Sequence, residues 1–359
     1  MVSEIRATSW RKTGLALVLA AAGFAGVAGI IHLLVGNGLR LHADMRSEKL
    51  MVMDEWQGRA YTAVFGSSHV HFGFDPRAFD VALFGSPLQT RTVNLAIQGG
   101  SQGEQRATAL AYLQHLQAPP KVGGAQACLV VLELKAGANF TNEHLIHPRA
   151  INIYDWPTTR FIARLTTPQM GLKQRVGRTG YAFAAMALHY MNVGMLSSSI
   201  FVPPIDNEAL RAETIEDRRG LVVMPANAKS TQAVEKEIAA SPSQPTVAQE
   251  GLLPSNSELL DELKAASPVK NVAMAYLVMP KISDLEAYTL MPDSIPWSGG
   301  EAPIVNMARP DLYREIYESK YWLDDAHLNE RGAALVTKLI AGNLKNWYSN
   351  HGQPARCGG

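Results

Sequence analysis

Four short, almost entirely apolar segments constrain the fold of this chain more than any other feature of its sequence. Continuous apolar runs of six to eight residues are typical of strands in a parallel sheet whose two faces are both covered. We therefore expect four buried strands. The four segments are Ala60–Phe65, Thr92–Ile97, Cys128–Leu134 and Val272–Met279.

Helical patterns lie between and after these segments. Gln102–Leu116 is predicted as a helix that ends ahead of a pair of prolines. Ser257–Ala266 is a second helix, with Ser255 or Ser257 as its N-terminal cap. Glu330–Tyr348 carries an apolar stripe at helical spacing. Strands that alternate with helices predict an α/β sandwich.

An uncharged apolar run of 23 residues, Thr13–Val35, predicts a transmembrane helix near the N-terminus. As a helix it would span roughly 30 Å of hydrocarbon, and the basic residues before it favour an N-terminus left in the cytoplasm. A cleaved signal peptide is the alternative, because small residues within the run resemble cleavage sites. We expect an uncleaved anchor, since the apolar run continues through Leu34. In either case the body of the protein is exported.

The chain is expected to form one anchored domain with a long insert. The expected parts are a cytoplasmic tail at 1–12, the anchor at 13–35, a connector at 36–58, a domain at 59–350 with an insert at about 140–269, and a flexible tail at 351–359. The first half of the insert is rich in Met and aromatic residues, which suits either a helical cap on the core or a docking face for a membrane partner or polysaccharide. Ala239–Ser257 is expected to carry little regular structure.

Charge and cysteine content narrow the possible partners. Against 32 acidic residues stand 33 basic ones, a formal net charge of +1, so no positive surplus could neutralise a nucleic-acid backbone. Cys128 lies in an apolar run and Cys357 in a polar tail, and no bridge between them is expected. His69 and His71 lack a third nearby ligand, so neither a metal nor a cofactor is predicted.

Two short motifs carry side chains suited to nucleophilic catalysis. Gly66-Ser67-Ser68 follows the first apolar segment, at the edge of the sheet where open α/β folds place their active sites. Asp324 and His327 lie three residues apart, just before the last helix, so one loop could deliver an acid and a base to the same place. Each motif also has a structural explanation: a tight turn for the first, and helix capping by aspartates for the second.

Together the two motifs resemble those of the SGNH/GDSL hydrolase family, in which an early Gly-x-Ser supplies the nucleophile and a late Asp-x-x-His supplies acid and base. Ser67 stands where the family usually has Asp, so the family's nucleophile falls on Ser68. The resemblance covers short patches of the chain and none of the insert. It implies a three-layer α/β/α, flavodoxin-like fold and a triad of Ser68, Asp324 and His327.

Two middle blocks of the family supply its oxyanion hole, and both have candidates here. Asn94–Ser101 follows the second apolar segment and implies Gly99 as a backbone donor. Gly137-Ala138-Asn139 follows the third and implies the Asn139 amide as another donor, with Asn142 as the alternative. Backbone N–H groups and an amide at strand ends could converge on a developing oxyanion.

An N-terminal anchor ahead of such a domain resembles periplasmic proteins that O-acetylate bacterial exopolysaccharides, some of which work with a membrane-bound O-acyltransferase. The resemblance implies acetyl transfer, through an acyl-serine, from an acetyl donor to a polysaccharide acceptor, in the periplasm at the bacterial inner membrane. A carbohydrate acetylesterase and a non-catalytic scaffold of an exopolysaccharide complex are the alternatives. The candidate substrate contacts are His69, His144, His147 and Arg149, and packing of the insert explains the last three equally well.

Overall fold

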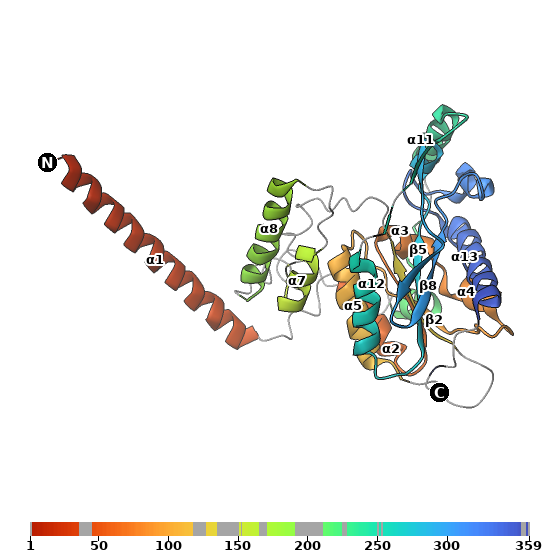
Figure 1. Ribbon diagram of the computed structural model, residues 1–359, viewed down its shortest axis with the longest axis horizontal. Helices are drawn as coiled ribbons and strands as arrows, with labels where there is room; N and C mark the ends of the chain where they lie inside the picture. Colours follow the sequence, from red (N-terminus) through yellow and green to blue (C-terminus); the bar gives the residue numbers. More distant parts are fainter. Residues whose placement is uncertain are drawn as a thin grey trace.

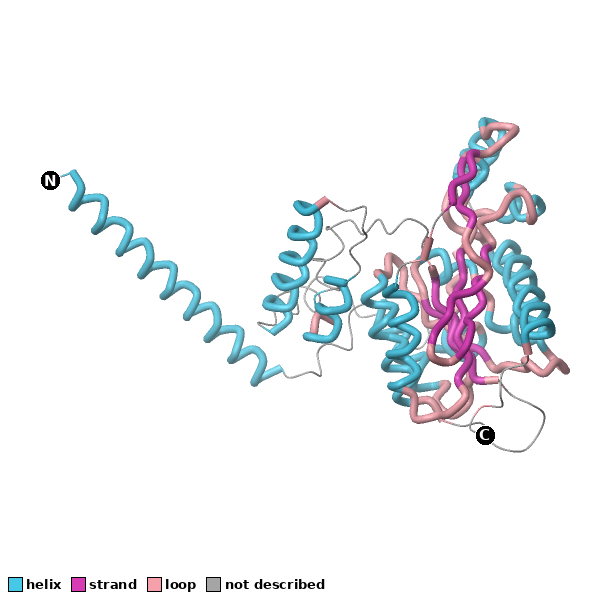
Figure 2. Tube along the Cα trace, viewed as in Figure 1, coloured by secondary structure: helices cyan, strands magenta, loops and turns pink. Residues whose placement is uncertain are grey.

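The protein is built around a six-stranded sheet with the strand order β2-β1-β3-β5-β8-β7 (Figures 1 and 2). The computed structural model describes residues 2–35, 45–117, 127–134, 151, 153–164, 171–190, 211–224, 228–249, 251–252, 254–352 and 357. The strands are β1 (Thr62–Phe65), β2 (Thr92–Asn94), β3 (Cys128–Glu133), β5 (Val272–Val278), β7 (Ser294–Trp297) and β8 (Gly300–Asn306).

All neighbouring strands of this sheet are parallel except β7, which runs antiparallel to β8. Numbered along the chain, the parallel strands follow the order 2-1-3-4-5, which is that of flavodoxin-like doubly wound sheets. In such sheets ligands bind beyond the carboxyl ends of the strands, where the order reverses. Here the reversal lies between β1 and β3.

The four expected strands are confirmed, and others were missed. The β7–β8 hairpin was not expected, and neither was the parallel pair of β4 (Thr246–Gln249) with β6 (Ala287–Leu290). The prediction of little regular structure in Ala239–Ser257 is therefore wrong. Side chains of β4 are exposed, so this strand has no apolar pattern by which the sequence could reveal it.

Helices cover both faces of the sheet and make a three-layer α/β/α sandwich (Figure 1). Side chains of β1, for example, alternate between two cores: Phe65 packs on one side and Val64 on the other. The first face is covered by α2 (Met45–Glu55), α5 (Gln102–His115) and α12 (Pro254–Ala266). The second is covered by α3 (Ser68–Gly73), α4 (Pro76–Leu83) and α13 (Glu330–His351).

The residues at which these helices begin are set by local capping hydrogen bonds and by proline. At the start of α5, Ser101 and Glu104 form a capping box, in which each side chain accepts the other's backbone N–H. The three expected helices are confirmed, but the caps expected for α12 are wrong. Its first residue is Pro254, and both Ser255 and Ser257 lie inside the helix, because proline suits the first turn of a helix.

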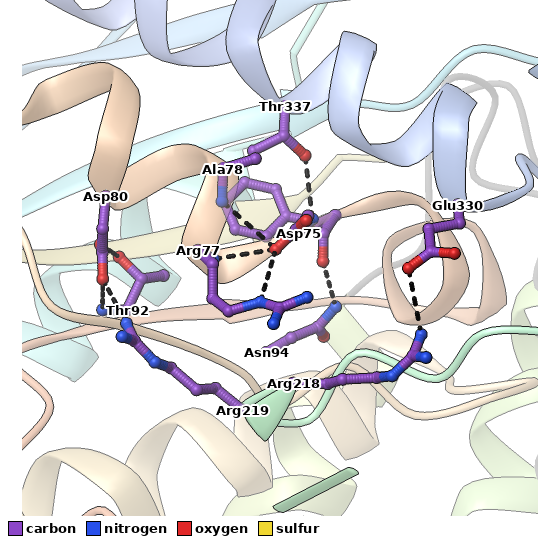
Figure 3. Close-up of polar contacts among 11 residues, drawn as sticks. Asp75, Arg77, Ala78, Asp80, Thr92, Asn94, Arg218, Arg219, Glu330 and Thr337 are labelled. Carbon is purple, nitrogen blue, oxygen red and sulfur yellow. Dashed lines mark hydrogen bonds and ion pairs between the residues drawn. The ribbon is translucent and has the colours of Figure 1, made fainter. Parts of the chain in front are cut away.

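The described part of the insert is largely helical, and it contacts the rest of the domain through ion pairs. It contains α7 (Trp156–Arg164), α8 (Leu172–Tyr190), a π-helical segment (Arg211–Asp217) and α11 (Ala228–Ala240). Just after the π-helical segment, Arg218 pairs with Glu330 of α13 and Arg219 with Asp80 of α4 (Figure 3). Asp80 also accepts the backbone N–H of Thr92, at the start of β2.

The N-terminal region forms one long helix, α1 (Val2–Val35), that stands apart from the α/β body in Figure 1. The described apolar side chains on it are exposed, as at Leu15, Leu17 and Phe24. Within the part of the chain that the structure describes, no helix is both long and apolar enough to cross a membrane. The transmembrane assignment of Thr13–Val35 stays a prediction.

A disulfide joins Cys128, the first residue of β3, to Cys357 near the C-terminus, so the expectation of no bridge is wrong. The physical reason lies in the path of the last helix. His351, at the end of α13, lines the same cavity as Val272 at the start of β5. The chain therefore returns to the amino edge of the sheet, where β3 also begins. A polar tail far away in sequence thus ends beside a buried cysteine.

We predict that Cys357→Ser lowers the free energy of unfolding by about 2–5 kcal/mol, because the bridge restricts the unfolded chain. Urea unfolding without reductant measures the change, and adding reductant should destabilise the wild type but not the variant. Two thiols that react in the unreduced, unfolded wild type would contradict the bridge.

A second stability prediction concerns Asp284, in the 3₁₀ helix η4 (Ile282–Leu285) after β5. Its carboxylate accepts the Lys281 backbone N–H and the Tyr317 hydroxyl. Burial raises the pKa of Asp284 to about 6, against an ordinary 3.8. The folded state therefore holds a proton more tightly than the unfolded state, so this residue's contribution to stability falls as pH rises from about 4 to above 6, by about 3 kcal/mol.

Asp284→Asn removes this titration. The difference in unfolding free energy between the variant and the wild type should thus shift in favour of the variant between pH 4 and pH 7.5. Urea unfolding at both pH values measures it. A difference that stays constant with pH would show that Asp284 titrates normally in the folded protein.

Candidate active site

The loop before α13 holds an aspartate and a histidine in direct contact. Nδ1 of His327 lies 2.9 Å from both carboxylate oxygens of Asp324. Oδ1 of Asp324 also accepts the backbone N–H groups of Ala326 and His327, at 2.9 and 2.8 Å. Asn329, not an aspartate, caps α13. The competing interpretation of the aspartates as helix caps is therefore wrong, and Asp324 instead orients the imidazole.

The charge of this pair follows from its hydrogen bonds. Burial acts to raise the pKa of Asp324, but hydrogen bonds from the His327 side chain and the Ala326 backbone outweigh it, and the pKa lies below its ordinary 3.8. An ionised carboxylate accepts hydrogen bonds and cannot donate them. The proton of a neutral His327 is thus held on Nδ1, and Nε2 keeps its lone pair. In Ser-His-Asp triads the same arrangement orients the general base.

The other ring nitrogen of His327 is buried and has no hydrogen-bond partner among the described residues. Two side chains of α3 contact the ring. His69 stacks on it with ring centroids 5.5 Å apart, and Phe72 meets it edge-on at 5.3 Å. A buried acceptor without a partner is uncommon in native proteins. Nε2 of His327 is therefore available to take a proton from a hydroxyl that approaches it.

Ser68 is the first residue of α3 and is half-buried. The next residue along the helix, His69, contacts the His327 ring. The hydrogen bond that a closed triad would have between Ser68 and Nε2 of His327 is not formed, although such bonds are often long in unliganded enzymes. Two of the three predicted triad residues are thus in contact, and the third begins the helix that packs on the base.

Ser67, the other hydroxyl of the motif, is unsuited to act as a nucleophile. Its side chain is buried, and its Oγ donates to Oε1 of Glu133 at 3.0 Å. A nucleophilic hydroxyl needs access to the substrate and a base that takes its proton. Between the two adjacent serines, burial favours Ser68, because Ser67 is buried and Ser68 is half-buried; its assignment as the nucleophile stays a prediction.

The turn after β2 lies directly against the Gly66 turn. The backbone N–H of Ile97 donates to Gly66 O at 2.9 Å, and a Cβ on Gly100 would lie 2.9 Å from the same oxygen. Gly99 has φ +64, a conformation that glycine adopts readily. The predicted oxyanion residue Gly99 therefore belongs to a turn that touches the predicted nucleophile motif.

Two polar residues near this turn have structural tasks that the sequence did not reveal. Nδ2 of Asn94 donates to Val70 O at 2.8 Å and to Phe74 O at 2.9 Å, which closes the C-terminal end of α3. Nδ1 of His71 lies 3.0 Å from Ala96 O. Burial, and then the positive charge of Lys49, lowers the pKa of His71 well below its ordinary 6.5. A neutral His71 therefore donates to Ala96 and joins α3 to the β2 turn.

Asn139, its alternative Asn142, and the proposed substrate residues His144, His147 and Arg149 all lie outside the described residues. Their assignments stay predictions.

Comparison with known proteins adds no family assignment: no family model, no curated protein and no solved structure matches the chain.

We predict that Asn94→Ala lowers the free energy of unfolding by about 1–3 kcal/mol, because it leaves buried carbonyls at the end of α3 without their donor. Urea unfolding measures this loss. Asn343→Ala, which removes a partly buried amide that donates to Leu339 O within α13, is the control and should cost less. Equal losses in the two variants would contradict a special role of Asn94.

Proposed function

We propose that this protein is a serine-dependent acyl-transfer enzyme of the SGNH/GDSL type, with Ser68 as nucleophile, His327 as general base and Asp324 as the acid that orients it. The observation that carries the proposal is the His327–Asp324 pair, with contacts of 2.9 Å and a buried Nε2 that has no partner in the described part of the chain. The flavodoxin-like strand order supports it, because Ser68 follows β1 at the point where such sheets bind ligands.

The proposed reaction runs in two halves. Nε2 of His327 takes the proton of Ser68 while Oγ attacks the carbonyl carbon of an acetyl ester. The bond from that carbon to the leaving oxygen breaks, and the leaving alcohol receives the proton from His327. A sugar hydroxyl, deprotonated by His327, then attacks the acetyl carbon of the acetyl-serine. The bond from that carbon to Oγ of Ser68 breaks, and His327 returns the proton to Oγ. Backbone N–H groups of Ser68 and Gly99, with the Asn139 amide, hold the oxyanion in both halves.

The acceptor that we propose is a secreted polysaccharide, with the domain in the periplasm and Thr13–Val35 holding it at the bacterial inner membrane. The uncharged run in α1 and its exposed apolar side chains support an anchor. The Cys128–Cys357 bridge supports an oxidising compartment. A membrane-bound O-acyltransferase would supply the acetyl group. With water as the acceptor, the same site would be a carbohydrate acetylesterase.

One observation favours a second candidate function. Nε2 of His327 has no hydrogen bond to Ser68, as expected for a non-catalytic scaffold that retains the fold and docks other components of a polysaccharide complex. A triad that closes only when a partner or substrate binds would look the same. Reactivity of Ser68 separates the two.

We predict that a fluorophosphonate probe labels the full-length, detergent-solubilised protein at Ser68. Ser68→Ala should abolish labelling at that site. His327→Ala should slow it by at least about a thousandfold, because the base and nucleophile act as a unit. Asp324→Asn should slow it strongly as well, since the imidazole loses its orienting charge. Labelling rates followed by mass spectrometry measure these effects.

Matched controls come from exposed residues of the same regions. Asp325→Asn changes the neighbouring, exposed carboxylate, and His351→Ala removes the histidine at the far end of α13; both should label at the wild-type rate. A folded wild type that never reacts, even with a candidate partner membrane present, would favour the scaffold. Once Ser68 is shown to react, supplying acetyl donor with and without glycan separates transferase from esterase.

A further inference from the structure

A buried carboxylate that the proposed chemistry does not use lies beneath the serine motif. Glu133 is the last residue of β3, a strand whose side chains are all buried, and is itself 4% exposed. A buried carboxylate is costly unless hydrogen-bond donors satisfy it. The residues that contact Glu133 therefore show what it holds in place.

Three contacts of Glu133 are made with the two residues that flank Ser68. The backbone N–H of Ser67 donates to Oε2 in a short hydrogen bond. Oγ of Ser67 donates to Oε1 at 3.0 Å. Nδ1 of His69 lies 3.4 Å from Oε1 and 3.1 Å from Oγ of Ser67. Glu133 thus binds the turn immediately before and immediately after the proposed nucleophile.

The fit of Glu133 against the turn leaves no spare room. A Cβ on Gly66 would lie 2.7 Å from Oε2 of Glu133 and 2.8 Å from its Cβ. Glycine is therefore needed at the first position of the motif to admit the carboxylate. The backbone oxygen of Glu133 accepts from Gln105 at 3.0 Å, which fixes the strand end to α5.

This network also sets the orientation of His69. Because the Ser67 hydroxyl donates its proton to Glu133, its oxygen is free to accept one from Nδ1 of His69. The hydrogen-bond network thus assigns the proton of a neutral His69 to Nδ1. The ring so held lies stacked on His327, with centroids 5.5 Å apart and planes inclined by 22°. Glu133 is therefore linked to the proposed base through His69.

We propose that Glu133 is a positioning residue: it holds the Ser67–Ser68–His69 turn so that Ser68 faces the site and His69 supports the ring of His327. The proposal rests on the proposed function, because it assigns Glu133 to the same serine site. It also predicts that His327 has two carboxylate-linked supports, Asp324 directly and Glu133 by way of His69.

The test compares fluorophosphonate labelling of the full chain in wild type and Glu133→Gln. Glutamine keeps the size of the side chain but replaces one acceptor oxygen with a donor, so it cannot accept both bonds from Ser67. We expect labelling of Ser68 to slow by on the order of 100-fold, the effect of misplacing a reacting group by about 1 Å. Asp80→Asn is the matched control. Its carboxylate also accepts a backbone N–H and hydroxyls, but at the amino edge of the sheet, so labelling should not change.

A second readout does not depend on activity. Nitrogen-15 NMR of the histidine rings reports which nitrogen carries the proton, and Glu133→Gln should shift the signals of His69 and His327 but not those of His351. Ser67→Ala removes only the hydroxyl link. This variant should keep the fold, slow labelling by about tenfold, in line with the loss of one hydrogen bond, and shift the His69 signals. It replaces Glu133→Gln as the test if that variant fails to fold.

The outcomes separate this proposal from the proposed function. If the wild type labels and both variants label at its rate, Glu133 has no positioning role and the serine site stands. If the wild type itself never labels, the proposed function fails, and the ring signals decide: unchanged His69 and His327 signals in the variants overturn the positioning role, whereas shifted signals support it. Slowed labelling in Asp80→Asn as well would overturn it too, since any lost carboxylate would then have the same effect.

Discussion

Strands β1, β3 and β5 are packed by helices on both faces, and this burial governs where polar chemistry can lie in the protein. Their side chains alternate between two apolar cores, so a charged group in the middle of a strand would lack partners. Polar residues are therefore displaced to the strand ends. Because the strands are parallel, the turn after β1, the turn after β2 and the end of β3 meet at one edge, and Ser68, Gly99 and Glu133 follow or end those strands.

The polar groups at this edge are held by a network rather than by single contacts. Asp324 fixes the imidazole of His327, while Glu133 fixes the residues on either side of Ser68. The two halves meet where His69 stacks on His327. Asn94 and His71 add a third connection, since they bind α3 to the β2 turn. Residues from distant parts of the chain, the Ser67–His69 turn and the Asp324–His327 loop, are brought together in this way.

Much of this arrangement could be predicted from the sequence. The remaining parts were missed for physical reasons that can be named. The four buried strands and the last helix could be predicted because continuous apolar runs and an apolar stripe at helical spacing are strong signals. Strand β8 was not predicted because Pro303 interrupts its apolar run, and a proline argues against the interior of a strand. The Cys128–Cys357 bridge and the contacts of Glu133 join residues far apart in the chain, so spacing alone could not reveal them. Asp324 and His327 were predictable because one short loop carries both.

The most direct test of the account is to look for the acyl-serine itself. Full-length protein would be mixed with p-nitrophenyl acetate, quenched in acid, digested and analysed by mass spectrometry. The account predicts one added acetyl group on the peptide that contains Ser68, at that residue, and its loss in His327→Ala. Acetylation confined to other residues, or equal acetylation of Ser68 in wild type and His327→Ala, would contradict the claim that His327 and Asp324 activate Ser68.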